Sequence, residues 1–169
     1  EKLVNVEYLS AVLLILVMDR PLTNKYWISI ADHDLPFVGI IEHTNMIDRS
    51  LYGGHHIVYL TNYPSRESEL YQKSAEELME ELTPHLRRLN PDFELSWILE
   101  SHHHKVDGAQ PIIGTNYSER IPDHRTPIKN LYLANTTQIY PEDRGTNYSV
   151  RMGRQVARMV LEDSGEVVD

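Results

Sequence analysis

The feature that most limits how this chain can fold is an apolar run near its start, from Tyr8 to Met18, interrupted only by Ser10. Its eleven residues are too few for a membrane-spanning helix, which needs about 20. Between Leu9 and Val17 the run is rich in leucine, valine and isoleucine, and a proline follows at Pro21. The pattern predicts a central strand covered on both faces, although its periodicity also fits a buried helix.

Shorter segments further along the chain also have the composition of strands. One of them places Leu95, Trp97 and Leu99 on a single face, as the two-residue period of a strand requires. Because strands and helices do not alternate regularly, we expect an α+β fold with a mixed, largely antiparallel sheet flanked by helices. The expected strands are Tyr26–Ile30, Phe37–His43, His55–Thr61, Glu94–His104 and Leu131–Ala134.

Two segments have the spacing of amphipathic helices. The first follows Ser74, which fits a capping box with Glu77 three residues later. Pro84 predicts either a kink in this helix or a second short helix capped by Thr83. The second helix is expected from about Asn147 to Glu162. Its buried stripe would consist of Val150, Gly153, Ala157, Val160 and Leu161.

Charge and missing residue types exclude several classes of protein. The chain has 16 lysines and arginines against 25 acidic residues, a net charge of −9, so it lacks a basic nucleic-acid footprint and would be repelled by anionic membranes. It has no cysteine, which excludes disulfides, thiolate catalysis and cysteine-bound metal clusters. No Walker loop or glycine-rich dinucleotide fingerprint occurs. We expect no nucleic-acid partner, no transmembrane segment and a cytoplasmic location.

Polar residues replace apolar ones abruptly at the end of the Phe37–His43 segment, where Glu42, His43, Thr44 and Asn45 follow one another. Ends of buried strands often carry functional sites, and ordinary loop hydrogen bonding is an equal alternative. His43 is the best local candidate for an acid or base, because histidine titrates near neutrality.

Three consecutive histidines, His102, His103 and His104, are a second candidate. On a strand, His102 and His104 would share one face while His103 points the other way. Two imidazoles do not complete a metal site, which needs at least a third ligand. We therefore expect no metal here.

The third candidate is the start of the last helix, Gly145–Ser149. A helix N-terminus presents unpaired N–H groups and partial positive charge, which suit a phosphate or an electron-rich carbonyl edge. The alternative is that Thr146 or Asn147 only caps a packing helix.

Sequence resemblance adds to these patterns. The segment from Asn130 to Ala157, which contains NLYLANTTQIYPEDRGTNYSV, resembles the C-terminal flavin-contacting segment of FAD-dependent oxidoreductases of the amine oxidase and protoporphyrinogen oxidase-like superfamily. Leu35–Asn45 and Ala109–Ile112 resemble other segments of these proteins, in the same order, so that the resemblance covers most of residues 8–162. Such proteins combine a dinucleotide-binding part with a substrate part that has a mixed sheet backed by helices.

The resemblance implies that this chain is the later portion of such an enzyme, because the glycine-rich motif and an initiator methionine before Glu1 are both missing. Residues 1–130 would form the substrate-type domain, residues 131–163 the strand-loop-helix that returns to the FAD-binding part, and residues 164–169 a tail. The whole enzyme would transfer a hydride from a C–N or C–C bond of a small-molecule substrate to flavin. The N-terminal FAD-binding part of the same polypeptide would be this chain's partner.

The resemblance also implies two groups of site residues. Glu42, Thr44, Asn45 and Gln110 would face the substrate. Asn135 stands where relatives often have an acidic residue, so it departs from their pattern. Without the glycine-rich phosphate loop, the chain alone would not hold FAD tightly. A non-catalytic module that binds a ligand or a protein is the alternative function. The expected FAD contacts are Asn135, Thr136, Gly145, Thr146, Asn147, Tyr148 and Ser149.

Overall fold

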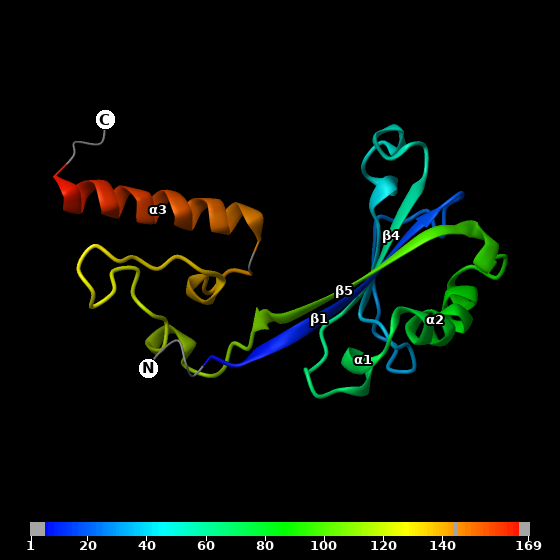
Figure 1. Ribbon diagram of the computed structural model, residues 1–169, viewed down its shortest axis with the longest axis horizontal. Coiled ribbons are helices and arrows are strands. Elements are labelled where there is room, and N and C mark those ends of the chain that lie inside the picture. Colours follow the sequence, from blue (N-terminus) through cyan, green and yellow to red (C-terminus); the bar gives the residue numbers. More distant parts are fainter. Residues whose placement is uncertain (1–5, 144, 166–169) are drawn as a thin grey trace. The chain divides into compact units, whose positions relative to one another are not determined.

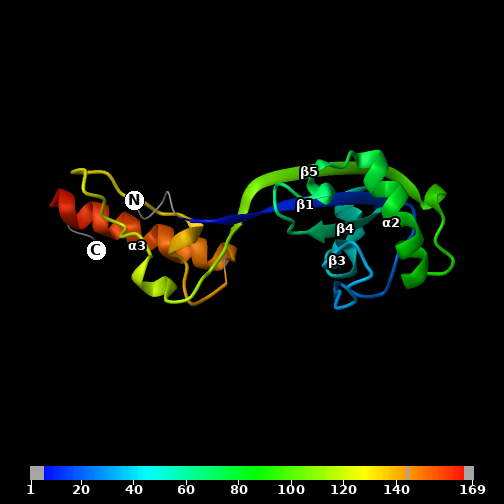
Figure 2. The same cartoon turned by 90° about the horizontal axis from the view of Figure 1, so that it is seen from below.

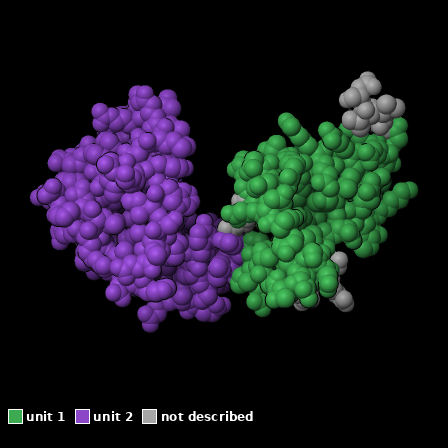
Figure 3. Space-filling model, turned by 180° about the vertical axis from the view of Figure 1, so that it is seen from behind, with its two compact units in different colours: residues 1–7, 111–169 green, residues 8–110 purple. Residues whose placement is uncertain are grey.

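A computed structural model describes residues 6–143 and 145–165 of the chain. They form two compact units: unit 2 is residues 8–110, and unit 1 is residues 1–7 together with 111–169 (Figure 3). The units therefore divide at residues 110 and 111, upstream of the boundary at 130 and 131 that the sequence leads us to expect. Most of the expected tail, residues 166–169, lies outside the described residues.

Unit 2 is built on a five-stranded antiparallel sheet, so the fold is α+β as expected (Figures 1 and 2). The strands lie side by side in the order β2-β3-β4-β1-β5, which puts β1 next to the edge strand β5. Neighbouring strands in the β2, β3, β4 and β1 part of the sheet run antiparallel. Their bounds are β1 Tyr8–Met18, β2 Trp27–Ser29, β3 Gly39–Glu42, β4 His56–Asn62 and β5 Ile98–Pro111.

The apolar run is indeed a strand, β1, but only one of its faces is fully covered. Leu14, Leu16 and Met18 are at most 2% exposed and pack with Leu82 and Leu86 of helix α2 (Ala75–Leu89) in the main core. The alternate residues of β1 from position 13 to 17 are only half-buried. The prediction of a strand covered on both faces was therefore wrong. Within residues 8–110, all of which are described, α2 is the one long helix, and it packs on a single face of the sheet.

Helix α2 begins as the sequence predicts. The Ser74 hydroxyl accepts a hydrogen bond from the Glu77 N–H, and the Glu77 carboxylate accepts one from the Ser74 N–H. The helix then continues without a break past Pro84, so no second helix starts at Thr83. The Thr83 hydroxyl instead donates to the carbonyl of Met79, 2.6 Å away. A shorter helix, α1 (Glu69–Gln72), precedes α2.

The strand expected at Glu94–His104 starts later. Residues Leu95–Trp97 form a short 3-10 helix, η3, and β5 begins at Ile98. This turn directs Trp97 into the core against Phe93, while Leu95 and Leu99 remain about half exposed. The prediction that these three residues share one strand face was wrong, because the helical turn breaks the two-residue period.

Unit 1 consists of helix α3 (Thr146–Ser164) and an irregular segment that contains the 3-10 helices η4 (Tyr117–Glu119) and η5 (Thr136–Gln138). The strand predicted at Leu131–Ala134 is absent from this described segment, where only a single bridge joins Arg125 to Tyr132. Both side chains bond the Asp163 carboxylate of α3 instead. These bonds lower the pKa of Asp163 to about 2.

The face of α3 that packs against the rest of unit 1 is not the predicted one. Met152 is buried, and Tyr148, Val156 and Met159 are half-buried beside it. Of the residues expected to be buried, Leu161 is half-buried, and the other four are exposed on another side of the helix. A Cβ on Gly153 would point into open space. We call this exposed side the outer face of α3; it comprises Val150, Gly153, Ala157 and Val160. No helix of the described residues is long and apolar enough to cross a membrane.

Candidate functional site

The Glu42 side chain, expected to face a substrate, is fully buried inside unit 2. One carboxylate oxygen accepts a hydrogen bond from the Leu22 N–H at 3.0 Å. The other accepts from the Thr23 N–H at 2.7 Å and from the Thr23 hydroxyl at 2.8 Å. These bonds satisfy both oxygens and fix the segment that follows β1.

Thr44 and Asn45 belong to a short 3-10 helix, η1 (His43–Asn45), between β3 and β4. The Thr44 hydroxyl accepts a hydrogen bond from the Ile57 N–H at 3.1 Å. The Asn45 amide donates to the carbonyls of Thr23 and Lys25, at 3.2 and 3.0 Å. Both side chains therefore brace the connection between the two strands.

His43 is the member of this group that belongs to an aromatic cluster. Its Nε2 lies 2.7 Å from the Tyr52 hydroxyl, at the end of the 3-10 helix η2 (Arg49–Tyr52). Its ring meets those of Tyr52 and Tyr59 edge-on, at centroid distances of 5.3 and 6.2 Å. Neither tyrosine is among the site residues predicted from the sequence. The sequence did contain a signal for Tyr59, because the two-residue period of a strand places it on the same face of β4 as Ile57 and Thr61.

Gln110 does not join Glu42 and its neighbours. Strand register places Glu42 opposite Val58, which pairs with Leu16 of β1. Gly108, near Gln110, lies beside Tyr8 at the other end of β1. Eight residues of strand separate the two ends, or about 26 Å at the usual rise per residue. The expected substrate-facing residues therefore belong to two separate places on the sheet.

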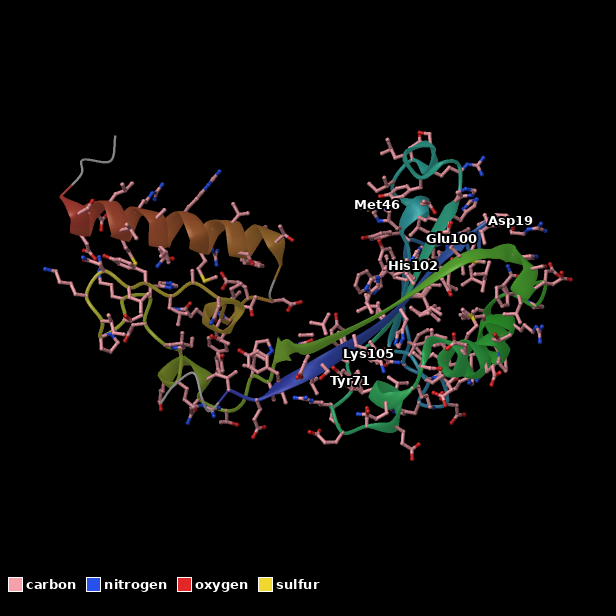
Figure 4. The ribbon with its side chains drawn as sticks, in the orientation of Figure 1. Asp19, Met46, Tyr71, Glu100, His102 and Lys105 are labelled. Carbon is pink, nitrogen blue, oxygen red and sulfur yellow. The ribbon has the colours of Figure 1, made fainter. Side chains whose placement is uncertain are left out.

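The three histidines lie on β5 at the sheet edge, and Figure 4 labels Glu100, His102 and Lys105 on this strand. His102 is exposed, with its Nε2 3.4 Å from the Glu100 carboxylate. Burial of His103 lowers its pKa, and the charges of Lys105 and His104 act in the same direction. Among the described residues, no three histidine or acidic side chains gather closely enough to hold a metal. The absence of a metal site stays a prediction.

In unit 1, helix α3 begins one residue earlier than expected. Gly145 is the N-cap and makes no side-chain cap, so Thr146 and Asn147 are the first helical residues rather than caps. Among the described residues, the N–H groups of Thr146 and Asn147 have no hydrogen-bond partner. A Cβ on Gly145 would overlap the Asn147 side-chain oxygen. Tyr148 and Ser149 complete the first turn, and their N–H groups bond the Gly145 carbonyl.

Asn135 has a different role, because it caps η5. Its side-chain oxygen accepts hydrogen bonds from the Thr137 N–H and hydroxyl, at 2.9 and 2.5 Å. The Gln138 side chain accepts from the Asn135 N–H at 2.9 Å. The start of α3 thus presents N–H groups without a partner among the described residues, whereas the Asn135 side chain is committed to its own turn. Thr136, the first residue of η5, is exposed.

Comparison with models of known protein families gives no match, and comparison with curated sequences gives none either. Solved structures do match. A protein from Exiguobacterium sp. 255-15 assigned as a protoporphyrinogen oxidase has a TM-score of 0.72 over 95% of this chain, with 12% identity. An oxidoreductase from Methanosarcina mazei has a TM-score of 0.62 over 94%, with 16% identity. Reduced UDP-galactopyranose mutase has a TM-score of 0.54 over 71%, also with 16% identity.

These likenesses establish a shared fold. The chain spans only 36% of the first two proteins and 26% of the third, so it corresponds to a portion of each. One of them carries the same name, protoporphyrinogen oxidase, as the superfamily that residues 130–157 resemble.

Proposed function

We propose that this chain is the later portion of an FAD-dependent oxidoreductase, with the start of α3 against the flavin. The observation that carries the proposal is the uncapped N-terminus at Gly145, where the N–H groups of Thr146 and Asn147 have no partner among the described residues. Such donors suit the electron-rich N1/O2 edge of a flavin. The fold shared with two oxidoreductases supports the same class.

In this proposal FAD supplies the hydride acceptor, and the chain's own residues orient it and respond to its charge. The backbone N–H groups of Thr146 and Asn147 would donate to the N1/O2 edge, where negative charge develops on reduction. Gly145 leaves room for the approach because it has no side chain. His43 would act on the substrate as acid or base.

The exposed apolar residues on the outer face of α3 support the proposal that this chain has a partner. Val150 and Val160 are 51% and 40% exposed, and small residues lie between them at Gly153 and Ala157. Small residues permit close packing of another backbone against a helix. We propose that the FAD-binding part of the same polypeptide covers this face.

The test replaces Gly145 with valine in the intact enzyme. The new side chain would overlap Asn147 and hold the backbone away from the ring. Loss of a charge-assisted hydrogen bond, about 1.5–3 kcal/mol, corresponds to a lower flavin potential by tens of millivolts, since roughly 30 mV equals 1.4 kcal/mol for two electrons. We expect that shift in a redox titration, together with slower flavin reduction by substrate.

The chain provides a matched control, because the pentapeptide of residues 145–149 recurs at residues 114–118. At Gly114 an added Cβ would likewise meet a mobile side chain, that of Arg120, but no long helix starts there. Gly114→Val should leave the potential unchanged. If Gly145→Val also left FAD affinity, potential and rate unchanged, α3 would be an ordinary packing helix.

The isolated chain provides a second measurement for this proposal. Because it contains no glycine-rich phosphate loop, it should not bind FAD stoichiometrically at micromolar concentration. Titration of FAD followed by flavin fluorescence or calorimetry measures this directly. Tight binding by residues 1–169 alone would contradict the assignment as a portion of a larger enzyme.

A further inference from the structure

Ion pairs hold both ends of α3 to the irregular segment of unit 1. Near the start of the helix, the Arg151 guanidinium donates a hydrogen bond to the Glu142 carboxylate. Near its end, Arg125 donates two hydrogen bonds to the Asp163 carboxylate, at 2.8 and 3.0 Å. We call these contacts the N-terminal and the C-terminal ion pair. They lie about 18 Å apart along the helix, at the usual rise per residue.

The aromatic ring of Tyr148 supports the N-terminal ion pair. The guanidinium carbon of Arg151 lies 4.9 Å from the centroid of this ring, one turn earlier on the same helix. An exposed ion pair usually contributes little, because both side chains must be immobilised to form it. Here the ring already restricts one of them, and Tyr148 is itself half-buried. The hydrogen bond from Arg151 also lowers the pKa of Glu142, so the carboxylate is charged at neutral pH.

Glu142 belongs to the stretch of chain that leads into α3. It lies three residues before Gly145, the N-cap of the helix. The Gly145 N–H donates to the Asp143 carbonyl at 3.0 Å. Its carbonyl accepts from the Tyr148 and Ser149 N–H groups, both at 3.1 Å. The N-terminal ion pair therefore fixes the backbone on one side of Gly145, and the first helical turn fixes it on the other.

We propose that the N-terminal ion pair positions the start of α3 against the flavin. The pair would hold the backbone around Gly145 so that the N–H groups of Thr146 and Asn147 point toward the N1/O2 edge. Glu142 and Arg151 are thus positioning residues, and neither needs to touch the flavin. This inference rests on the proposed function, because it takes the start of α3 to contact the flavin.

Glu142→Ala separates this role from a simple effect of charge. Reduction of the flavin builds up negative charge near N1, so removal of a nearby carboxylate would by itself favour the reduced form and raise the potential. Loss of positioning acts in the opposite direction, because the N–H groups would then stabilise the reduced form less. Arg151→Ala lowers the potential in either case. The sign of the shift in Glu142→Ala therefore decides between positioning and charge.

The first measurement is a redox titration of the intact enzyme. Arg151→Ala and Glu142→Ala should each lower the flavin potential by up to about 20 mV, which is a fivefold change at roughly 30 mV per factor of ten for two electrons. About fivefold is the upper range of an exposed ion pair. Arg151→Lys should keep most of the original potential, because an ammonium group also pairs with a carboxylate and packs on an aromatic ring. A potential raised by Glu142→Ala would overturn the inference.

Arg125→Ala is the matched control, because it breaks the C-terminal ion pair of the same helix. It removes two hydrogen bonds to Asp163, so it should lower the melting temperature at least as much as Arg151→Ala does. The flavin potential should not change. An equal shift of the potential in Arg125→Ala and Arg151→Ala would assign both ion pairs to the stability of α3 alone, against the inference.

The second measurement needs no flavin and uses the chain of residues 1–169. Loss of the N-terminal ion pair in either alanine variant should speed hydrogen exchange of the Tyr148 and Ser149 amides about two- to fivefold, whereas Arg125→Ala should not. Unchanged exchange in both alanine variants would contradict the inference. If Gly145→Val shifts the potential and the two alanine variants do not, positioning is wrong and the proposed function stands. If Gly145→Val leaves the potential unchanged, the proposed function fails, and this inference fails with it.

Discussion

At the scale of single residues, unit 2 contains polar side chains that the fold uses internally. His56 of β4 is 8% exposed, its Nδ1 is buried without a partner in the described part of the chain, and its Nε2 lies 3.3 Å from the Arg49 guanidinium. Burial lowers the pKa of His56, the Arg49 charge lowers it further, and Glu42 and Asp19 oppose this. The neutral imidazole is therefore the form that the folded chain favours.

This predicts a loss of stability in mild acid. Below about pH 6.5, the usual histidine pKa, the unfolded chain binds a proton that folded His56 still refuses, so the free energy of unfolding falls as the pH is lowered. Above that pH His56 is neutral in both states and contributes no slope. Each pKa unit by which the folded and unfolded states differ lowers the free energy of unfolding by about 1.36 kcal/mol once the pH is below both values. Urea unfolding at pH 7.5 and pH 5.5 measures the loss.

His56→Gln should flatten this pH dependence, and the exposed His33 provides the control as His33→Gln, which should not. His103 contributes in the same direction, because burial lowers its pKa too. Some slope should therefore remain in the His56 variant. An unchanged slope in His56→Gln would show that another group is responsible.

The polar character of the strand end at Glu42 was predictable from the sequence. The groups to which its side chains bond were not. The sequence indicates that Glu42, Thr44 and Asn45 follow a buried strand, and they do. Which backbone N–H or carbonyl group each side chain reaches depends on segments such as Leu22–Lys25 that fold back from elsewhere. The His43–Tyr52 bond likewise depends on a turn whose final glycine, Gly53, has a left-handed φ of 64°.

At the scale of elements, the N-terminal cap of α2 has a measurable weight. Ser74→Ala removes the side-chain acceptor of the capping box and should lower the free energy of unfolding by about 1 kcal/mol. Ser68 caps the four-residue helix α1 in the same way, so Ser68→Ala is a control that should cost less, because α2 carries buried leucines and α1 carries none. Chemical unfolding followed by circular dichroism compares the two. Equal losses of unfolding free energy in Ser74→Ala and Ser68→Ala would contradict the greater weight given to the cap of α2.

Elements with a strong local pattern were predictable, and those set by tertiary contacts were not. The capping box and periodicity identify α2, and the apolar run identifies β1. Leu131–Ala134 has strand composition, but no strand lies beside it among the described residues, so only one bridge forms. For α3 the period was right and the covered face was wrong, because two sides of the helix carry apolar residues and the sequence does not say which one packs.

At the scale of the whole molecule, substitutions on the outer face of α3 should act differently in the isolated chain and in its proposed parent enzyme. Val150→Ser with Val160→Ser should change the stability of the isolated chain by no more than about 0.5 kcal/mol per site, the usual effect of exposed substitutions. In the parent the same change should lower the melting temperature and weaken FAD retention. Met152→Ser, on the packed face, is the control that should destabilise both. A parent unaffected by the valine changes would leave the outer face without a partner.

The position of β5 at the sheet edge has a consequence for the chain in solution. Its fourteen residues offer a row of backbone groups on which a second molecule could add a strand. Glu100, Lys105 and Asp107 place charges along this strand, and charged side chains on an edge strand oppose unwanted pairing. Salt weakens that protection, since the screening length falls from about 8 Å at physiological strength to about 3 Å at 1 M. Concentrated salt should therefore favour filament-like aggregation through β5.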